Sequence, residues 1–189
     1  MQGDMKNKPI DVQPIRTVAQ IENMKNALLK YCSFRDYILF TLGINIGLRV
    51  SDILKLQVKT VKDQSHILLK EKKTKKHSKF FIPDGLRVIL NNYCQGKDME
   101  DWLFPSRKGN GPITPTQAYR ILQKAGEMAG IEHIGTHTMR KTFGYHFYKK
   151  TKDVATLMKI FSHSAPSITE RYIGITQDEI DDSLKGFML

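Results

Sequence analysis

The sequence predicts a mostly α-helical domain of the α+β class. Apolar residues recur at helical spacing before about residue 47 and again after about residue 84. Between these two regions the pattern changes to short β-like pieces separated by turn residues. A length of 189 residues with 40% hydrophobic residues suits one domain that buries a core.

The first part of the chain is expected to contain an arm and two helices. Residues 1–16 are polar and carry two prolines, so we expect a flexible arm or linker there, followed by the domain over 17–189. The motif Thr17-x-x-Gln20 has the form of a capping box and predicts the start of the first helix. A second helix, from about Ser33 to near Gly47, is apolar nearly all round, which is typical of a helix at the centre of a core.

The region after these helices is expected to form a small three-stranded antiparallel sheet. The three β-like pieces are 57–61, 66–69 and 79–82. Asp63-Gln64-Ser65 has the composition of a turn, and a lysine-rich stretch from Lys70 to Lys79 joins the last two pieces. The last two strands are therefore expected to be joined by a basic connection.

The remainder is expected to be helical. Two helix starts carry a clear signal: Thr114-Pro115 places a capping residue before a proline, and Ser167-x-x-Glu170 has the form of a capping box. The second motif follows His163 and a turn, so the short helix after it is expected to double back beside this histidine. The predicted helices span 84–95, 115–129, 137–150, 153–162, 168–173 and 177–186.

Composition narrows the class of protein. A formal charge of +11 and a pI near 9.6 indicate a polyanionic partner, because lysines and arginines that face a nucleic acid release its condensed counterions. Cys32 and Cys94 lie in apolar helix-like stretches, which supports neither a disulfide framework nor a cysteine metal site. Residues 1–11 lack the apolar core of a signal peptide, and no apolar run approaches the roughly 18 residues that span a bilayer. We therefore expect a protein of the reduced cytoplasm without a membrane partner.

Two arginines are candidates for holding a phosphodiester. Arg49, in Gly47-Leu48-Arg49-Val50-Ser51-Asp52, follows a very apolar helix, which is an unusual place for a solvated charge. Arg140 ends the motif Thr136-His137-Thr138-Met139-Arg140. A guanidinium binds two phosphate oxygens at once, and two guanidinium groups neutralise a phosphorane-like transition state without a metal ion. Either arginine alone is more often an ordinary surface residue, so the prediction depends on their combination.

Two histidines and a tyrosine complete the candidate site. His137 and Arg140 are expected on one face of a helix near its N-terminus, which suits phosphate. His163 is followed nine residues later by Tyr172, the candidate nucleophile. His133 and His137 are four apart, but the glycine between them and the lack of a third clustered ligand disfavour a metal site.

The order and spacing of these motifs resemble the tyrosine recombinase, or phage integrase, family over about residues 17–186. The resemblance implies a catalytic domain that cleaves and rejoins DNA strands at specific sites through a 3′-phosphotyrosyl link. This link conserves the bond energy, so no cofactor is expected. The implied roles are a nucleophile, Tyr172; phosphate binding by Arg49 and Arg140; proton transfer and phosphate binding by His137 and His163; and support of the arginine site by Asp52.

The resemblance also places a lysine on the turn between the last two strands, where it protonates the departing 5′-oxygen. Lys73 matches the Lys-Thr form of that turn, but its interval to Pro83 is two residues longer than usual. Lys75 keeps the usual interval and is the alternative. The other basic residues expected to contact DNA are Lys70, Lys72, Lys76, Lys79 and Lys141.

The sequence departs from the family pattern in two respects. Ser162 stands where the family usually has glycine, and the small size of serine predicts little damage. The N-terminal helical domain that clamps the other face of DNA in most members does not precede residue 17. The chain is expected to be either an excised catalytic domain or a naturally short member similar to the fimbrial phase-switch recombinases. Either form should bind DNA more weakly, and with more salt sensitivity, than members that have the clamping domain.

Two other functions share these residues. A type IB topoisomerase uses the same chemistry as a monomer, whereas a regulator on this fold would bind DNA without cleaving it. Every catalytic position is filled, which disfavours the regulator. The expected helix 177–186 resembles the family's tail that docks on a neighbouring protomer. This feature favours a recombinase that assembles as a homotetramer on double-stranded DNA; a monomer in solution, and packing of this helix on its own domain, stay open.

Overall fold

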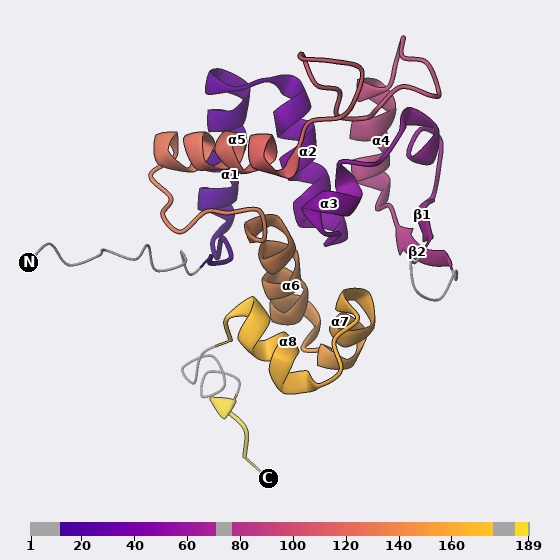
Figure 1. The fold of residues 1–189 in the computed structure, drawn as a ribbon. Helices are drawn as coiled ribbons and strands as arrows, with labels where there is room; N and C mark the ends of the chain where they lie inside the picture. Colours follow the sequence, from indigo (N-terminus) through magenta and orange to yellow (C-terminus); the bar gives the residue numbers. More distant parts are fainter. Residues whose placement is uncertain (1–11, 71–76, 176–183, 189) are drawn as a thin grey trace, which may run out of the picture.

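The computed structural model describes residues 12–70, 77–175 and 184–188 (Figure 1). Helices dominate these residues, and none of them is long and apolar enough to cross a membrane. The helices and strands are α1 (Val18–Tyr31), α2 (Phe34–Ile46), α3 (Val50–Ile53), the 3-10 helix η1 (Val58–Thr60), β1 (His66–Lys70), β2 (His77–Phe81), α4 (Asp84–Tyr93), α5 (Pro115–Met128), α6 (Thr138–Thr151), α7 (Val154–Phe161) and α8 (Pro166–Ile173).

Helix α2 lies at the centre of the larger of the two hydrophobic clusters that the described residues form. It contacts α1, α4, α5 and α6, and its residues Ile38, Leu39, Phe40 and Leu42 are completely buried. Burial on all sides confirms the expectation from its nearly continuous apolar sequence.

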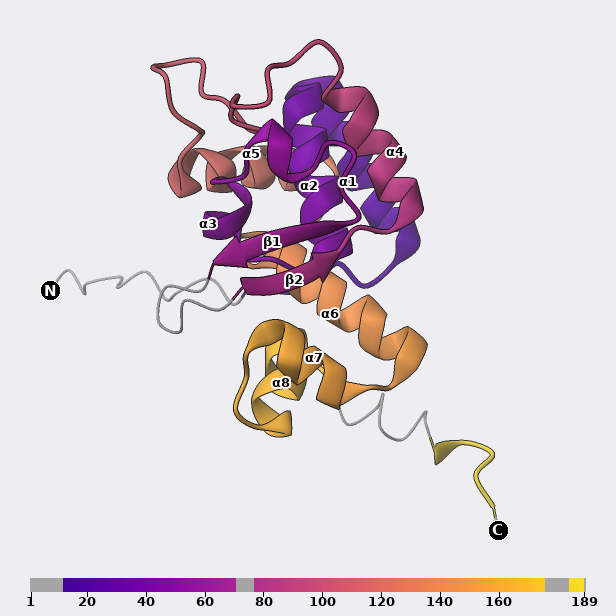
Figure 2. The ribbon, with the colours of Figure 1, turned by 90° about the vertical axis from the view of Figure 1, so that its right-hand side faces the viewer.

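Helix α6 leads from this body to α7 and α8 at one end of the molecule (Figures 1 and 2). A second, smaller hydrophobic cluster lies there. Leu157, Phe161 and Ile173 form its buried centre, and they come from α7 and α8. Since α6 contacts α2 as well as α7 and α8, it connects the two clusters.

The hairpin has two strands among the described residues, so the predicted third strand over 57–61 is wrong. β1 and β2 pair antiparallel, with His66 opposite Phe81 and Lys70 opposite His77. Residues Val58–Thr60 instead form the 3-10 helix η1. Val58 and Val61 are both completely buried, and a spacing of three puts side chains on one side of a helical turn but on opposite faces of a strand.

Two helix starts test the predicted caps. Thr17 caps α1 as predicted, since its side chain accepts a hydrogen bond from the Gln20 backbone N–H. The predicted cap at Ser167 is wrong, because α8 begins at Pro166 after Ala165. Proline at the first helical position needs no hydrogen-bond partner for its nitrogen, which explains the earlier start.

The described end of the expected arm packs on the body. Ile15 is only 1% exposed and belongs to the large cluster. Its backbone N–H donates a 2.9 Å hydrogen bond to Oγ1 of Thr142 on α6. The predicted helix 177–186 lies largely outside the described residues.

Candidate active site

The N-terminus of α6 carries the first two candidate residues. His137 is the residue immediately before the helix, and Arg140 lies one turn into it. The Arg140 side chain is buried and donates hydrogen bonds to the carbonyl oxygens of Gly47, at 2.6 Å, and Phe161, at 3.0 Å. Arg140 therefore connects the ends of α2 and α7, and its guanidinium also lies 4.3 Å from the centre of the Phe161 ring.

Arg49 reaches the same region because α2 ends abruptly. Gly47 caps α2 in the left-handed conformation, with φ of 72°, and a Cβ there would collide with the Phe143 ring. Only glycine fits both constraints. Arg49 follows as the residue before α3, where it is exposed to solvent. Burial lowers the pKa of both His137 and His163, and the charges of Arg140 and Arg49 lower it further.

Tyr172 lies within a ring of aromatic side chains. Its hydroxyl is 3.1 Å from Nδ1 of His137. Its ring centre is 5.2 Å from that of His163 and 5.4 Å from that of Phe161, and both contacts are edge-on. The short helix α8 thus turns back beside His163, as predicted.

The charges of the site shift the pKa of its members. Burial raises the pKa of Tyr172, and Arg140 and Arg49 oppose this effect. Burial lowers the pKa of His137, and the positive charges of Arg140, Lys141 and Arg49 lower it further. Burial also lowers the pKa of Arg140, to about 10, so this arginine stays charged at neutral pH. A neutral histidine therefore faces a protonated tyrosine beside two cations.

Two further residues lie close to the members of the candidate site. Nδ1 of His163 lies 3.0 Å from Oγ1 of Thr169, which is completely buried in α8. This contact fixes the orientation of the His163 ring through Nδ1. Asp52 in α3 is close enough for its charge to raise the pKa of Arg140, against the effect of burial.

The structure places the expected lysines unequally. Lys72, Lys73, Lys75 and Lys76 lie outside the described residues. Lys70 ends β1, and Lys79 on β2 is exposed. Lys141 is half-buried: its Nζ donates a 2.7 Å hydrogen bond to the Val12 carbonyl and lies 5.4 Å from the centre of the Tyr172 ring.

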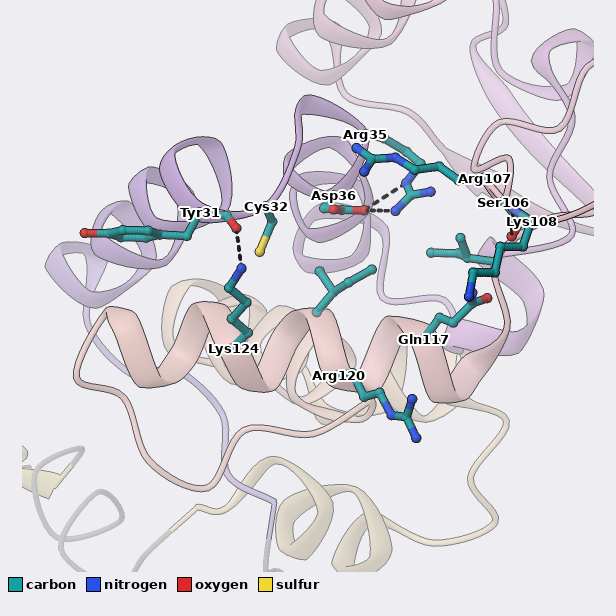
Figure 3. A pocket seen from close by; sticks show the side chains of 12 residues that line it. Tyr31, Cys32, Arg35, Asp36, Ser106, Arg107, Lys108, Gln117, Arg120 and Lys124 are labelled. Atoms are coloured by element: carbon teal, nitrogen blue, oxygen red, sulfur yellow. Dashed lines mark hydrogen bonds and ion pairs between the residues drawn. The ribbon is translucent and has the colours of Figure 1, made fainter.

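A basic concavity on the larger body was missed by the sequence reasoning (Figure 3). It has a volume of about 470 Å³ and lies between the α1–α2 junction, α5 and the loop after Pro105. Asp36, a buried carboxylate in this concavity, is bound by Arg35, whereas Arg107 and Lys108 on the loop are exposed. A turn-like Gly109-Asn110-Gly111 directly after these two cations was the signal available in the sequence.

Ser162 caps α7 with a strained backbone. Its φ of 55° and ψ of 44° lie in the left-handed region, which glycine adopts at little cost and other residues avoid. The expectation for Ser162 considered the size of its side chain, whereas the constraint at this position is the positive φ of the backbone. Backbone conformation explains why glycine suits this position.

Replacing Ser162 by glycine should stabilise the protein. We expect Ser162→Gly to raise the free energy of unfolding by about 0.5–1 kcal/mol, after the larger chain entropy of glycine is subtracted. Urea denaturation of the variant and wild type measures this change. Ser164→Gly is the matched control, because Ser164 has no positive φ and glycine there should be neutral or destabilising. Equal effects of the two substitutions would contradict the strain argument.

Fold and site together define a tyrosine recombinase catalytic domain. The profile of the phage integrase family matches residues 16–179, and the chain belongs to this family. The probable integrase/recombinase YoeC of Bacillus subtilis is 49% identical over 176 residues, which cover 93% of this chain and 97% of YoeC. A tyrosine recombinase of Pseudothermotoga lettingae is 31% identical over 154 residues, which cover 79% of this chain but 53% of that protein.

Solved structures share the fold. The crystal structure of XerA recombinase matches with a TM-score of 0.74 at 17% identity, over 96% of this chain and 66% of that one. XerH site-specific recombinase, solved bound to its difH substrate, matches with a TM-score of 0.65 at 18% identity, over 99% of this chain and 58% of that one. The chain thus spans about two thirds of the XerA structure and less of the XerH structure, and it shares the fold of the part that it matches.

Proposed function

We propose that this chain cleaves and rejoins double-stranded DNA at specific sites, with Tyr172 as the nucleophile. The observation that carries the proposal is the 3.1 Å contact between the Tyr172 hydroxyl and Nδ1 of His137, beside Arg140. This contact supports the proposal because it joins, from α8 and α6, side chains that are suited to be nucleophile, proton acceptor and cation.

The proposed reaction assigns a task to each group. The Tyr172 oxygen attacks the scissile phosphorus, and its proton passes to the neutral Nδ1 of His137. Arg49 and Arg140 stabilise the charge on the non-bridging oxygens, Nε2 of His163 contacts one of them, and Asp52 supports Arg140. The bond to the 5′-oxygen breaks, and this oxygen takes a proton from Lys73 or, as the alternative, Lys75.

The role of His137 predicts a pH dependence. Its pKa is lowered by burial and by neighbouring cations, so the base form predominates at neutral pH and is lost as the pH falls through this lowered pKa. We expect the single-turnover cleavage rate to be flat near pH 7 and to fall on the acid side, below the ordinary pKa of about 6.5. His137→Gln should remove this acid limb together with most of the rate. An unchanged limb in the variant would assign the titration to another group.

The basic concavity is proposed to extend the DNA contact beyond the reacting phosphate. Arg107→Gln should weaken binding to all duplexes and reduce the slope of log K against log salt by about 1, because one phosphate contact releases about one counterion. Filter binding across a salt series measures the slope. Arg87→Gln is the control, because the Arg87 guanidinium already pairs with Asp84 at 2.9 Å. Equal slopes for Arg107→Gln and wild type would contradict a DNA contact at the concavity.

The proposed function is tested by trapping the covalent intermediate. The wild-type chain, incubated with nicked suicide duplexes from its native genomic neighbourhood, should form an adduct that survives denaturing electrophoresis. The adduct should form in EDTA, because two arginines supply the charge that a metal ion supplies elsewhere. Binding without an adduct would favour the regulator, and relaxation of supercoils by the monomer would favour a type IB topoisomerase.

The assembly proposed on DNA is a homotetramer, in which residues 177–186 dock on a neighbouring protomer. Strand exchange between two duplexes needs four cleavages, which a tetramer provides one per subunit. The proposed setting is the cytoplasm, where the DNA substrate is accessible.

A further inference from the structure

The residues before α1 form a strap along α6. We define the strap as residues 12–16. The backbone of Ile15 is bound at both ends: its N–H donates to Thr142, and its carbonyl accepts a 2.9 Å hydrogen bond from Nε2 of His146. The Val12 carbonyl accepts from Lys141, and the Gln13 N–H donates to the His133 carbonyl at 3.1 Å. The strap is thus fixed to the same helix that carries His137 and Arg140.

The end of the strap reaches the helix that carries Tyr172. Nη2 of Arg16 donates a 2.9 Å hydrogen bond to the carbonyl of Gly174, the residue that caps α8. Carbonyl groups at the C-terminus of a helix carry partial negative charge and lack partners within the helix, so a guanidinium is well suited there. Gly174 lies two residues after Tyr172, and the contact therefore acts on the last turn of α8.

The strap packs closely against the C-terminus of α8 at Gly174. Its φ is 71°, and a Cβ at this position would lie 3.0 Å from Nη2 of Arg16, 3.6 Å from Oε1 of Gln13 and 3.8 Å from Cδ of Pro14. Three strap residues thus surround the cap. A second link passes through Lys141, whose Nζ contacts both the Val12 carbonyl and the face of the Tyr172 ring.

We propose that Arg16 is a positioning residue for strand cleavage, which holds the Tyr172 helix in register with His137 through the Gly174 carbonyl. This inference rests on Tyr172 being the nucleophile. Helix α8 has eight residues and packs on α6 and α7, and α6 also holds the strap. A displacement of about 1 Å at a reacting group costs on the order of 10²-fold in rate, so one hydrogen bond at the helix end has a measurable effect.

The first measurement is independent of chemistry. Arg16→Met keeps an unbranched apolar side chain but loses the guanidinium, which bonds Gly174 and whose carbon lies 5.0 Å from the centre of the Tyr145 ring. Hydrogen–deuterium exchange of the amides of Gly174 and Ile175, which bond to Arg171 and Glu170, should be faster in this variant by about tenfold. Arg87→Met removes the same charge from α4 and should leave this exchange unchanged. Unchanged exchange in Arg16→Met overturns the inference whatever the activity of the wild type.

The second measurement is the rate of adduct formation with the DNA saturated by protein. Arg16→Met should slow adduct formation by about 10- to 100-fold, and Arg16→Lys, which retains a donor, should recover most of the rate. The defect should persist on a 5′-bridging phosphorothiolate duplex, because a sulfur leaving group bypasses proton donation but not attack by the tyrosine. A defect that disappears at high protein concentration, or on the phosphorothiolate, contradicts positioning. If Arg16→Met speeds the exchange but the wild-type chain forms no adduct, the proposed function is refuted, and with it any role of Arg16 in cleavage, whereas the hold of Arg16 on α8 stands.

Discussion

Tyr172→Phe should abolish the covalent link to DNA and leave the fold and DNA binding nearly unchanged. The substitution removes one oxygen, which contacts His137, whereas the ring keeps its packing against Phe161 and His163. We expect adduct formation to fall by at least about 10³-fold, as the loss of a catalytic nucleophile does in other enzymes. Denaturing electrophoresis after incubation with a nicked duplex measures the adduct, and a gel shift measures binding.

The matched control is Tyr148→Phe. Tyr148 packs against the same small cluster as Tyr172 but lies at the far end of α6 from His137. Removal of its hydroxyl should leave the adduct in place. If Tyr172→Phe still formed the adduct, the nucleophile would be another residue.

Arg140→Lys should impair both cleavage and stability, although the charge is conserved. The guanidinium bonds the Gly47 and Phe161 carbonyls at once, and the single ammonium of lysine cannot reproduce this planar fork. We expect a loss of about 10²- to 10³-fold in single-turnover cleavage. A buried carbonyl left without its partner should also lower the free energy of unfolding by about 1–3 kcal/mol.

The effect of Arg140→Lys on cleavage can be measured apart from its effect on stability by the choice of temperature and by a control variant. Cleavage is measured well below the unfolding midpoint, where both proteins are folded, and stability is measured by urea denaturation. Arg171→Lys makes the same change at an exposed position on α8 and should alter neither quantity appreciably. A cleavage rate near wild type in Arg140→Lys would show that a point charge suffices at this position.

Local sequence patterns predicted most of the helices. Their apolar spacing and their capping residues lie within the element itself, as Thr17 and Thr114 show. The sequence pattern did not predict α3, which has only four residues. It also predicted a strand around Val58 and Val61, two buried valines that belong to the turn of η1. Short apolar stretches do not distinguish a strand from a helical turn.

The candidate site was predictable as a set of residues but not as an arrangement. The motifs named Arg49, His137, Arg140, His163 and Tyr172, and the structure brings all five into one region. The carbonyl partners of Arg140 are 93 and 21 residues away in the chain, so no local pattern reveals them. The same holds for the contact between Arg16 and Gly174, which joins positions 158 residues apart.

The two hydrophobic clusters divide the site between parts of unequal size. Arg49 belongs to the large body, whereas Tyr172 belongs to the small cluster around Leu157, Phe161 and Ile173, and His163 packs on the Phe161 ring of that cluster. A small cluster has less apolar contact to oppose its own opening, so α7 and α8 should detach at a lower temperature than the one that melts the body. Heating should therefore inactivate this enzyme before it unfolds, and cooling should restore activity as long as the body has stayed intact.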